Sequence, residues 1–280
     1  MKKISRRSFL AAAAVSAAAL ALTACGGSAS TASSAAASSV AASSEAASTS
    51  AAAAELTTVE AGKLTMATNA AFPPYEMTTD AGEFEGIDID TAKAIAEKLG
   101  LELQIDDMDF DAALLSVQQG KADIVMAGVT VTDERKAVMD FSDSYATGIQ
   151  SIIVPEGSDI ASPDDLAGKK IGTQRGTTGY IYCSDDFGDE NVVAYDDGLT
   201  AVQALNNGQV DAVVIDNAPA QEFVAANPGL KVLDTSYAEE DYAIGMAKGS
   251  ALEDAVNKAL EELKADGTLQ AIVDKYITAE

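Results

Sequence analysis

The amino-acid sequence predicts an α/β protein with two similar lobes, each a mainly parallel sheet flanked by helices. The main observation is an internal repeat: G-K-A-D followed by I-V-M-A-G begins at Gly120, and G-Q-V-D followed by A-V-V-I-D begins at Gly208. Each copy follows an amphipathic run, which indicates a helix before a buried strand. A second observation is an echo between residues 62–64 (G-K-L) and 168–170 (G-K-K), each of which precedes another strand-like run. Strand–helix–strand units pair their strands in parallel, so two such sets predict two lobes.

A strand-like run at 242–247 follows the second repeat, which predicts that the chain returns to its first lobe. The second lobe is then inserted into the first, and two extended crossovers, near 145–152 and near 235–242, join them. The expected boundaries are 56–147 and 240–280 for lobe 1, and 148–239 for lobe 2.

Helix signals fall between the expected strands. The apolar spacing over 92–99 predicts one helical face, and Gly100 is a typical stop. Ser162 is a good N-cap because a proline follows it at the first helical position. Residues 252–265 and 269–276 predict two C-terminal helices that are separated by an Asp-Gly pair.

The first 24 residues predict an export signal peptide. Four basic residues lie in the first seven positions, and residues 9–22 form an apolar run that is too short to span a membrane. The signal ends in L-T-A-C, which resembles a bacterial lipobox and predicts a diacylglycerol on Cys25. The segment S-R-R-S-F-L from Ser5 also resembles a twin-arginine export motif, and the general secretory route is the alternative.

Residues 25–55 comprise this cysteine and a stretch that consists almost entirely of Ala, Ser and Thr. Such a composition cannot bury a core, so we expect a disordered tether. As a flexible coil it would reach roughly 30 Å. Two acyl chains on Cys25 would hold the mature protein on the outer face of the bacterial cytoplasmic membrane.

Composition argues against several functional classes. The formal charge of −26 argues against nucleic acid and anionic lipid as partners. The chain has no histidine, which rules out His-based catalytic triads and His metal sites. Cys183 is the only cysteine besides Cys25, so we expect no metal, no cofactor and a buried thiol without a reactive role.

Two charged residues indicate a ligand cleft between the expected lobes. In the repeat, Gly128 and Asp216 each lie five residues after the aligned aspartate, at the carboxyl ends of equivalent strands, where open α/β sheets bind ligands. Arg135 follows Thr132, a good N-cap, in the first turn of a predicted helix. A guanidinium beside free N–H groups can receive a carboxylate. An arginine from one lobe and an aspartate from the other suit a zwitterion.

Seven sequence blocks, specific in combination, extend from about Gly62 to Tyr276. They are G-K-L-T-M-A-T-N-A-A-F-P-P-Y-E from Gly62, G-I-D-I-D-T-A-K-A-I-A from Gly86, D-F-D-A-A-L from Asp109, A-G-V-T-V-T-D-E-R from Ala127, F-S-D-S-Y from Phe141, Q-R-G-T-T-G from Gln174 and V-D-A-V-V-I-D from Val210. Together they resemble the bacterial solute-binding proteins of family 3, the polar amino-acid receptors of ABC importers.

The resemblance implies a type II periplasmic-binding-protein fold that binds a free L-amino acid, with a polar side chain favoured. Cleft closure would then deliver the ligand to an ABC permease with its ATPase. By the same resemblance, Arg135 would grip the ligand α-carboxylate, helped by backbone N–H groups near Thr130 and Thr178. Asp216 would accept the α-ammonium, with the Gly128 carbonyl and the Thr130 hydroxyl.

The resemblance also implies a side-chain pocket made of Asn69, Phe72, Phe110 and Gln174. Phe72 and Phe110 have turn-like, polar flanks, so we expect their rings to be exposed in the cleft. Gly128 stands where many relatives carry serine, so one hydroxyl ligand would be missing. Asn69 stands where binders of basic amino acids often carry aspartate, which weakens the case for lysine or arginine as the ligand.

Two other functional classes remain open beside transport. One is a dehydratase-like enzyme on the same fold, although no acid is obviously placed for proton transfer. The other is a sensory amino-acid receptor, although the sequence ends at Glu280 without a transmembrane or signalling segment. We expect transport without chemistry on the ligand, by a protein that acts as a monomer.

Overall fold

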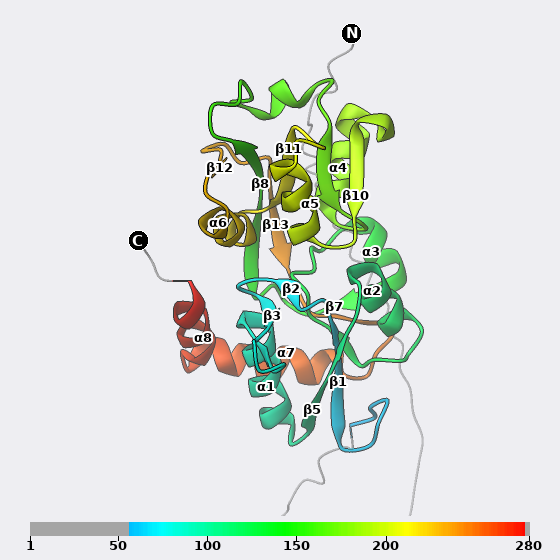
Figure 1. Cartoon of the computed structure of the whole chain (residues 1–280). Helices are drawn as coiled ribbons and strands as arrows, with labels where there is room; N and C mark the ends of the chain where they lie inside the picture. Colours follow the sequence, from blue (N-terminus) through cyan, green and yellow to red (C-terminus); the bar gives the residue numbers. More distant parts are fainter. Residues whose placement is uncertain (1–55, 278–280) are drawn as a thin grey trace, which may run out of the picture. The chain divides into compact units, whose positions relative to one another are not determined.

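The computed structural model describes residues 56–277 (Figure 1). The expected signal peptide, the lipidated Cys25 and the tether at 25–55 lie outside the described residues. Within the described part of the chain, no helix is long and apolar enough to cross a membrane.

Lobe 1 is built on a five-stranded sheet in the order β5-β1-β6-β14-β7. β1 (Lys63–Thr68) pairs in parallel with β5 (Glu102–Asp107) on one side and with β6 (Ile124–Val125) on the other. β14 (Gly245–Ala247) lies antiparallel between β6 and β7 (Met139–Phe141). Most of β1 is buried, as expected for a central strand that is covered on both faces.

Helices cover this sheet, and a small three-stranded sheet adjoins it. The elements are α1 (Ile87–Leu99), α2 (Phe110–Gln118), α3 (Asp133–Val138), α7 (Glu253–Ala265) and α8 (Thr268–Tyr276), with the hairpin strands β2 (Ala71–Phe72), β3 (Glu76–Thr78) and β4 (Phe84–Glu85). α1 ends at Gly100, whose left-handed conformation (φ 70°) terminates the helix without a Cβ clash, as the sequence predicted. α7 and α8 are the two predicted C-terminal helices.

Lobe 2 is built on a second sheet in the order β10-β9-β11-β8-β12, and β13 also pairs with β8. Its strands are β8 (Ala146–Pro155), β9 (Ile171–Gln174), β10 (Val192–Tyr195), β11 (Ala212–Asp216), β12 (Leu230–Val232) and β13 (Ala238–Tyr242). Its helices are α4 (Thr178–Phe187), α5 (Gly198–Asn206) and α6 (Asn217–Ala226), with short 3-10 turns at Pro163–Leu166 and Asp189–Asn191. Buried aliphatic residues of β8 and β11, such as Ile152 and Val214, form the centre of the lobe.

Two crossovers join the lobes, as the sequence predicted. β8 and β13 pair antiparallel, from Tyr242 opposite Ala146 to Ala238 opposite Gln150. In Figure 1 they run side by side from the sheet of lobe 2 towards lobe 1. β14 follows β13 along the chain and pairs in the sheet of lobe 1, so lobe 2 is inserted into lobe 1.

Both sheets are mixed, and each contains one strand that runs against its neighbours. β14 is antiparallel to both of its neighbours in lobe 1, and β8 is antiparallel to β11, β12 and β13 in lobe 2. The other pairings of these two sheets are parallel, so the α/β class with helix-flanked sheets is confirmed, with sheets that are mixed where mainly parallel ones were expected. β8 carries the chain from lobe 1 into lobe 2, and β14 follows the return crossover, β13, into lobe 1. Each of these two strands therefore begins beside the other lobe. Their neighbours end there, so the pairing is antiparallel.

The repeat corresponds to equivalent helix–strand units, α2–β6 and α5–β11. In both units the repeat aspartate accepts a hydrogen bond from a backbone N–H of the neighbouring parallel strand or of the residue just before that strand. Asp123 Oδ2 accepts from Thr65 at 2.8 Å, and Asp211 Oδ2 accepts from Lys170 at 2.8 Å. The repeated aspartates therefore have a structural role, since each fixes the position of a neighbouring strand.

The strand register shows that the expected match between residues 62–64 and residues 168–170 is wrong by one residue. Met66 pairs with Ile124 and Ile171 pairs with Ala212, and Ile124 and Ala212 each directly follow the repeat aspartate. Met66 is therefore equivalent to Ile171, so position 63, and not position 62, corresponds to position 168. The glycines of both triplets form turns with positive φ, and the distance from turn to strand differs by one residue between the lobes.

Candidate functional site

A pocket between the two lobes, counted together with the solvent at its mouth, contains about 300 Å³ of space that no atom fills. It lies at the carboxyl ends of β6 and β11, where the repeat predicted a ligand cleft. Its lining residues are Asn69, Phe72, Glu76, Phe110, Ala127, Gly128, Thr130, Arg135, Gln174, Thr177, Thr178 and Asp216. All nine ligand-site residues named from the sequence are among them, and three, Glu76, Ala127 and Thr177, are additional.

Arg135 is held firmly on the lobe 1 side of the pocket. The backbone N–H of Arg135 donates to the side chain of Thr132, the N-cap of α3, at 3.1 Å. The guanidinium Nη1 donates to the carbonyl of Thr130 at 2.7 Å, and Nη2 donates to the carbonyl of Gly176 in lobe 2 at 3.2 Å. The guanidinium carbon lies 5.4 Å from the ring centroid of Phe110, an arrangement that favours a cation. Guanidinium has five N–H donors, so further donors remain for a carboxylate.

Lobe 2 contributes a carboxylate and a helix start. Asp216 is the last residue of β11, and its Oδ2 accepts a hydrogen bond from Gln150 Nε2 at 2.8 Å. Its other oxygen, Oδ1, is buried and has no hydrogen-bond partner among residues 56–277. Thr178 begins α4, and the N–H groups in the first turn of a helix have no partner within that helix. Free donors for an anion therefore lie on the same wall as a free acceptor for a cation.

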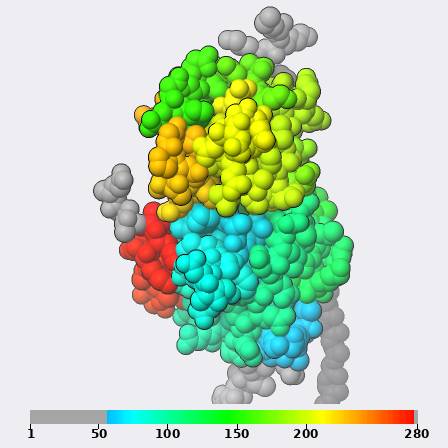
Figure 2. Space-filling view, viewed as in Figure 1, coloured from blue at the N-terminus to red at the C-terminus, as the bar shows by residue number. Residues whose placement is uncertain are grey.

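The two lobes touch each other around the pocket. Gln174 Nε2 donates to Asn69 Oδ1 across the interface at 2.8 Å. The hydroxyl oxygens of Thr130 and Thr178, from opposite lobes, are 3.4 Å apart. On the face drawn in Figure 2, the yellow and orange atoms of lobe 2 meet the cyan atoms of lobe 1. The cleft is therefore closed in this structure.

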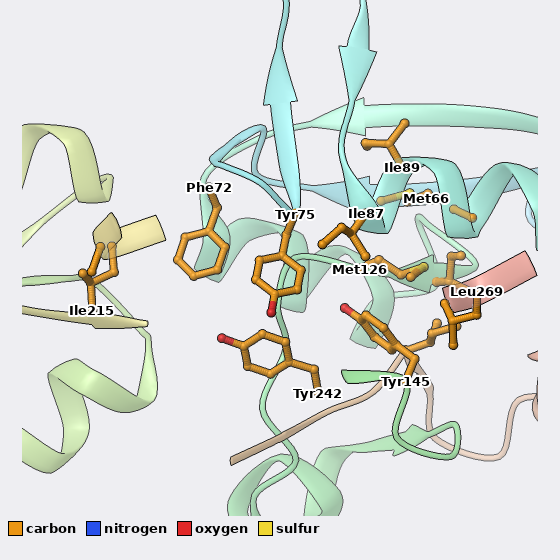
Figure 3. Packing of buried hydrophobic residues seen from close by; sticks show 14 of the residues in the cluster. Met66, Phe72, Tyr75, Ile87, Ile89, Met126, Tyr145, Ile215, Tyr242 and Leu269 are labelled. Carbon is orange, nitrogen blue, oxygen red and sulfur yellow. The ribbon is translucent and has the colours of Figure 1, made fainter. Parts of the chain in front are cut away.

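Phe72 and Phe110 line the pocket, but the prediction that their rings are exposed is wrong. Their exposed fractions are only 7% and 5%. Phe72 stacks on Tyr75 at a centroid distance of 5.9 Å, and Tyr75 packs edge-on against Tyr242, as Figure 3 shows. The polar flanks in the sequence belong to the loops that carry the rings, and contact between the lobes covers the rings themselves.

The structure explains why position 128 is glycine, where many relatives carry serine. Its φ of 55° is left-handed, and its N–H donates to Asp88 Oδ2 at 3.0 Å. A Cβ at this position would lie 2.9 Å from a carbon of the Phe72 ring and 3.3 Å from a carbon of the Tyr242 ring. A serine hydroxyl therefore fits only if Phe72 moves, so the aromatic ring occupies the space that a further polar contact would need.

The sequence analysis missed Glu240, which connects both lobes beside the pocket. Its Oε2 accepts hydrogen bonds from Thr130 Oγ1 at 3.0 Å, Thr178 Oγ1 at 2.9 Å and Gln150 Nε2 at 3.0 Å. Glu240 lies two residues before the buried Tyr242 in β13, so the two side chains share one face of the strand. Alternation along a strand could have predicted that Glu240 is buried on the same face as Tyr242. The three consecutive acids at 239–241 obscure that alternation in the sequence.

Burial alters the ionisation of the acids around the pocket. Burial, together with the charge of Glu240, raises the pKa of Asp216 to about 7. Burial raises the pKa of Asp88 to about 6. Burial and the charges of Asp88 and Asp216 also raise the pKa of Glu76 well above its ordinary value. A cation that enters the pocket would favour the ionised form of such carboxyl groups.

Comparison with known proteins identifies the family. Residues 64–279 match the bacterial extracellular solute-binding proteins, family 3. This chain belongs to that family. The family and the relatives described below are solute-binding proteins and not enzymes, so the dehydratase-like alternative is not supported.

Several relatives of this family 3 protein are known. The L-cystine-binding protein TcyJ of Escherichia coli (strain K12) is 33% identical over 226 residues, which cover 79% of this chain and 85% of that protein. The arginine-binding extracellular protein ArtP of Bacillus subtilis (strain 168) is 33% identical over 228 residues, which cover 78% of this chain and 87% of that protein. The arginine-, lysine-, histidine-binding protein ArtJ from Geobacillus stearothermophilus aligns with a TM-score of 0.75 and 35% identity, over 78% of this chain and 96% of that one.

Proposed function

We propose that this family 3 protein binds a free L-amino acid between its lobes and delivers it to an ABC permease with its ATPase. The observation that carries the proposal is that one closed pocket holds both a fixed guanidinium, Arg135, and a carboxylate oxygen of Asp216 that accepts no hydrogen bond from the described residues. A carboxylate and an ammonium on one carbon match these two groups. The relatives described above are named for binding cystine, arginine, lysine and histidine, which supports an amino acid as the ligand.

In this proposal the nine residues named from the sequence form the ligand site. Arg135 and the N–H groups near Thr130 and Thr178 bind the α-carboxylate, whereas Asp216 accepts the α-ammonium with the Gly128 carbonyl and the Thr130 hydroxyl. The remaining four line the side-chain region: Asn69, Phe72, Phe110 and Gln174. One chain contributes every residue, so the protein would act as a monomer.

We further propose that ligand binding closes the cleft by bending at the crossovers. The lobes would be 56–147 with 240–280 and 148–239, boundaries that fall within the paired strands β8 and β13. A ligand held by both lobes favours the closed form over an open one, which is what a population shift requires. The permease would then recognise the closed form of the protein.

A thermal-shift screen of the twenty amino acids tests the proposed function. A ligand at a hundred times its Kd should stabilise the native state by about 2.7 kcal/mol. Small-angle scattering with the best ligand should then show a smaller radius of gyration than without it. If no amino acid raises the melting temperature, amino-acid binding is the wrong function, and an unchanged radius would contradict closure.

The affinity for the amino acid should fall at acidic pH. The pKa of Asp216 is about 7 in the ligand-free pocket. The ligand ammonium needs the ionised carboxylate, so binding releases a proton below this pH, and the affinity should drop by up to about tenfold per pH unit. The sign for stability is the reverse: the folded pocket favours the protonated form, so this group's contribution to stability is lost as the pH rises from its ordinary pKa of 3.8 to about 7.

Calorimetry between about pH 5.5 and about pH 8, in buffers of different ionisation enthalpy, measures both the affinity and the released proton. An affinity that is constant over this range, with no proton release, would show that Asp216 does not titrate against the ligand.

We propose that residues 1–24 are removed and that a lipid on Cys25 anchors the protein outside the cytoplasmic membrane. The L-T-A-C motif supports this proposal, and the family is extracellular. Cys25→Ser should release the mature protein into the medium or periplasm. Cys183→Ala is the matched control, because this buried cysteine should not affect anchoring. Membrane fractionation is the measurement, and a Cys25→Ser protein that stays with the membrane would rule out the lipid anchor.

A further inference from the structure

Glu240 binds both lobes through a single carboxylate oxygen. Its Oε2 accepts hydrogen bonds from the Thr130 hydroxyl at 3.0 Å and from the Thr178 hydroxyl at 2.9 Å, and these two residues belong to opposite lobes. Gln150 Nε2, from the other crossover strand, donates to the same oxygen at 3.0 Å. None of these four residues, called the cross-lobe cluster below, is more than 7% exposed. Its hydrogen bonds are therefore shielded from water, and bonds to a charged acceptor are strong in such a place.

The complete cross-lobe cluster requires closed lobes. Glu240 lies in β13, and the backbone of that strand is fixed to lobe 1, because the N–H of Val131 donates to the carbonyl of Asp241 at 3.0 Å. Thr178 begins α4 in lobe 2. Bending at the crossovers would move Thr178 away from Glu240, while Thr130 would stay beside it. The bond between Thr178 and Glu240 therefore stabilises the closed form only.

Glu240 also sets the direction of the hydrogen bonds that two ligand-site hydroxyls can make. A carboxylate can only accept, so the Thr130 hydroxyl donates its one hydrogen to Glu240. Only acceptor lone pairs of that hydroxyl remain for the ligand, and these suit an ammonium. The Thr178 hydroxyl donates to Glu240 as well, which leaves the backbone N–H of Thr178 as its donor for a carboxylate.

The cross-lobe cluster is connected to both charged groups of the proposed ligand site. Gln150 Nε2 donates to Oδ2 of Asp216 at 2.8 Å as well as to Glu240. Burial lowers the pKa of Arg135, and the charge of Glu240 opposes this effect. Glu240 therefore favours the charged guanidinium of Arg135 and holds the amide that is bonded to Asp216.

We propose that Glu240 is a positioning residue for ligand binding, which stabilises the closed cleft and fixes the Thr130 and Thr178 hydroxyls as acceptors. The inference rests on the proposed function, because it needs the ligand to be held in the closed cleft. It gives a role to a crossover residue that is not among the residues lining the pocket.

Binding kinetics on the mature protein test this role. The probe is a 13C-labelled mixture of the twenty amino acids, from which NMR selects the amino acid that binds. Calorimetry gives its Kd and exchange NMR gives its dissociation rate, and the ratio of the two gives the association rate.

Glu240→Gln should raise the dissociation rate about thirtyfold, the scale expected when a buried, hydrogen-bonded charge is removed. Glutamine keeps the shape, but its single carbonyl oxygen has two lone pairs and cannot accept all three donors. The association rate should change by less than about threefold, because the ligand meets the open form, in which the bond to Thr178 is absent.

Thr178→Val tests the closed-form bond while Glu240 is unchanged. It removes the hydroxyl but keeps the backbone N–H that the proposed site uses, and the dissociation rate should rise about tenfold. Glu239→Gln and Thr147→Val are the matched controls at exposed positions of β13 and β8, and they should change neither rate.

The outcomes separate this inference from the function on which it rests. If no amino acid of the mixture binds the unaltered protein, the proposed function is wrong and the inference fails with it. If one binds, but Glu240→Gln and Thr178→Val leave its dissociation rate within about threefold, only the inference is wrong. A loss in the association rate alone would also overturn it, since Glu240 would then shape the open site. Thr178→Val decides the matter if Glu240→Gln does not fold.

Discussion

Arg135→Lys should reduce the affinity for the native amino acid by two to four decades. The guanidinium is buried, and it is fixed by the carbonyls of Thr130 and Gly176 and by the ring of Phe110. In that position it can offer a planar pair of donors to a carboxylate, a geometry that an ammonium cannot reproduce. Loss of one partner from a desolvated ion pair costs about 3–5 kcal/mol, and each decade of affinity corresponds to about 1.4 kcal/mol.

Calorimetry measures this loss, and Arg175→Lys is the control. Arg175 is half-exposed, lies in the loop before α4 and pairs with Asp196 at 3.6 Å, so its replacement should leave binding unchanged. The decarboxylated amine of the ligand should also fail to bind the unaltered protein, because it lacks the group that Arg135 holds. A lysine variant that keeps affinity within about tenfold would mean that Arg135 does not bind the carboxylate.

Asp216→Asn should cause a loss of similar size on the other side of the ligand. Oδ1 of Asp216 is buried and has no hydrogen-bond partner within residues 56–277, while Oδ2 accepts a hydrogen bond from Gln150. Asparagine keeps the shape but removes the charge, so the ligand ammonium would enter the closed pocket without its counter-ion. We therefore expect an affinity loss of about 3–5 kcal/mol here too.

The deaminated acid of the ligand isolates the same contact without a mutation. It should fail on the unaltered protein, and Asp234→Asn, an exposed change in lobe 2, should leave the affinity of the amino acid unaltered. If the deaminated acid binds within about tenfold of the amino acid, Asp216 is not the ammonium acceptor.

Repeated local patterns account for the parts of this molecule that were predictable. The apolar spacing before Gly100, the cap at Thr132 and the break between α7 and α8 are decided by neighbours within a few residues, so the sequence indicates them directly. Alignment of the two repeat copies on their aspartates predicted the helix–strand units. It therefore also predicted the edge of each sheet where Gly128 and Asp216 lie. The one-residue error in the upstream echo arose because turn glycines do not define strand register.

The α/β class, the two lobes, the crossovers and the position of Arg135 and Asp216 at one cleft could all be predicted from the amino-acid sequence. The burial of particular acids, the covering of Phe72 and Phe110 and the position of Glu76 in the pocket became visible in the folded structure alone. The reason is separation along the chain. Glu240 and Thr130 are 110 residues apart, and Gln174 and Asn69 are 105 apart, yet each pair is hydrogen-bonded. Helix and strand periods connect residues only over a few positions, whereas burial and ionisation depend on side chains that the closing of two lobes brings together.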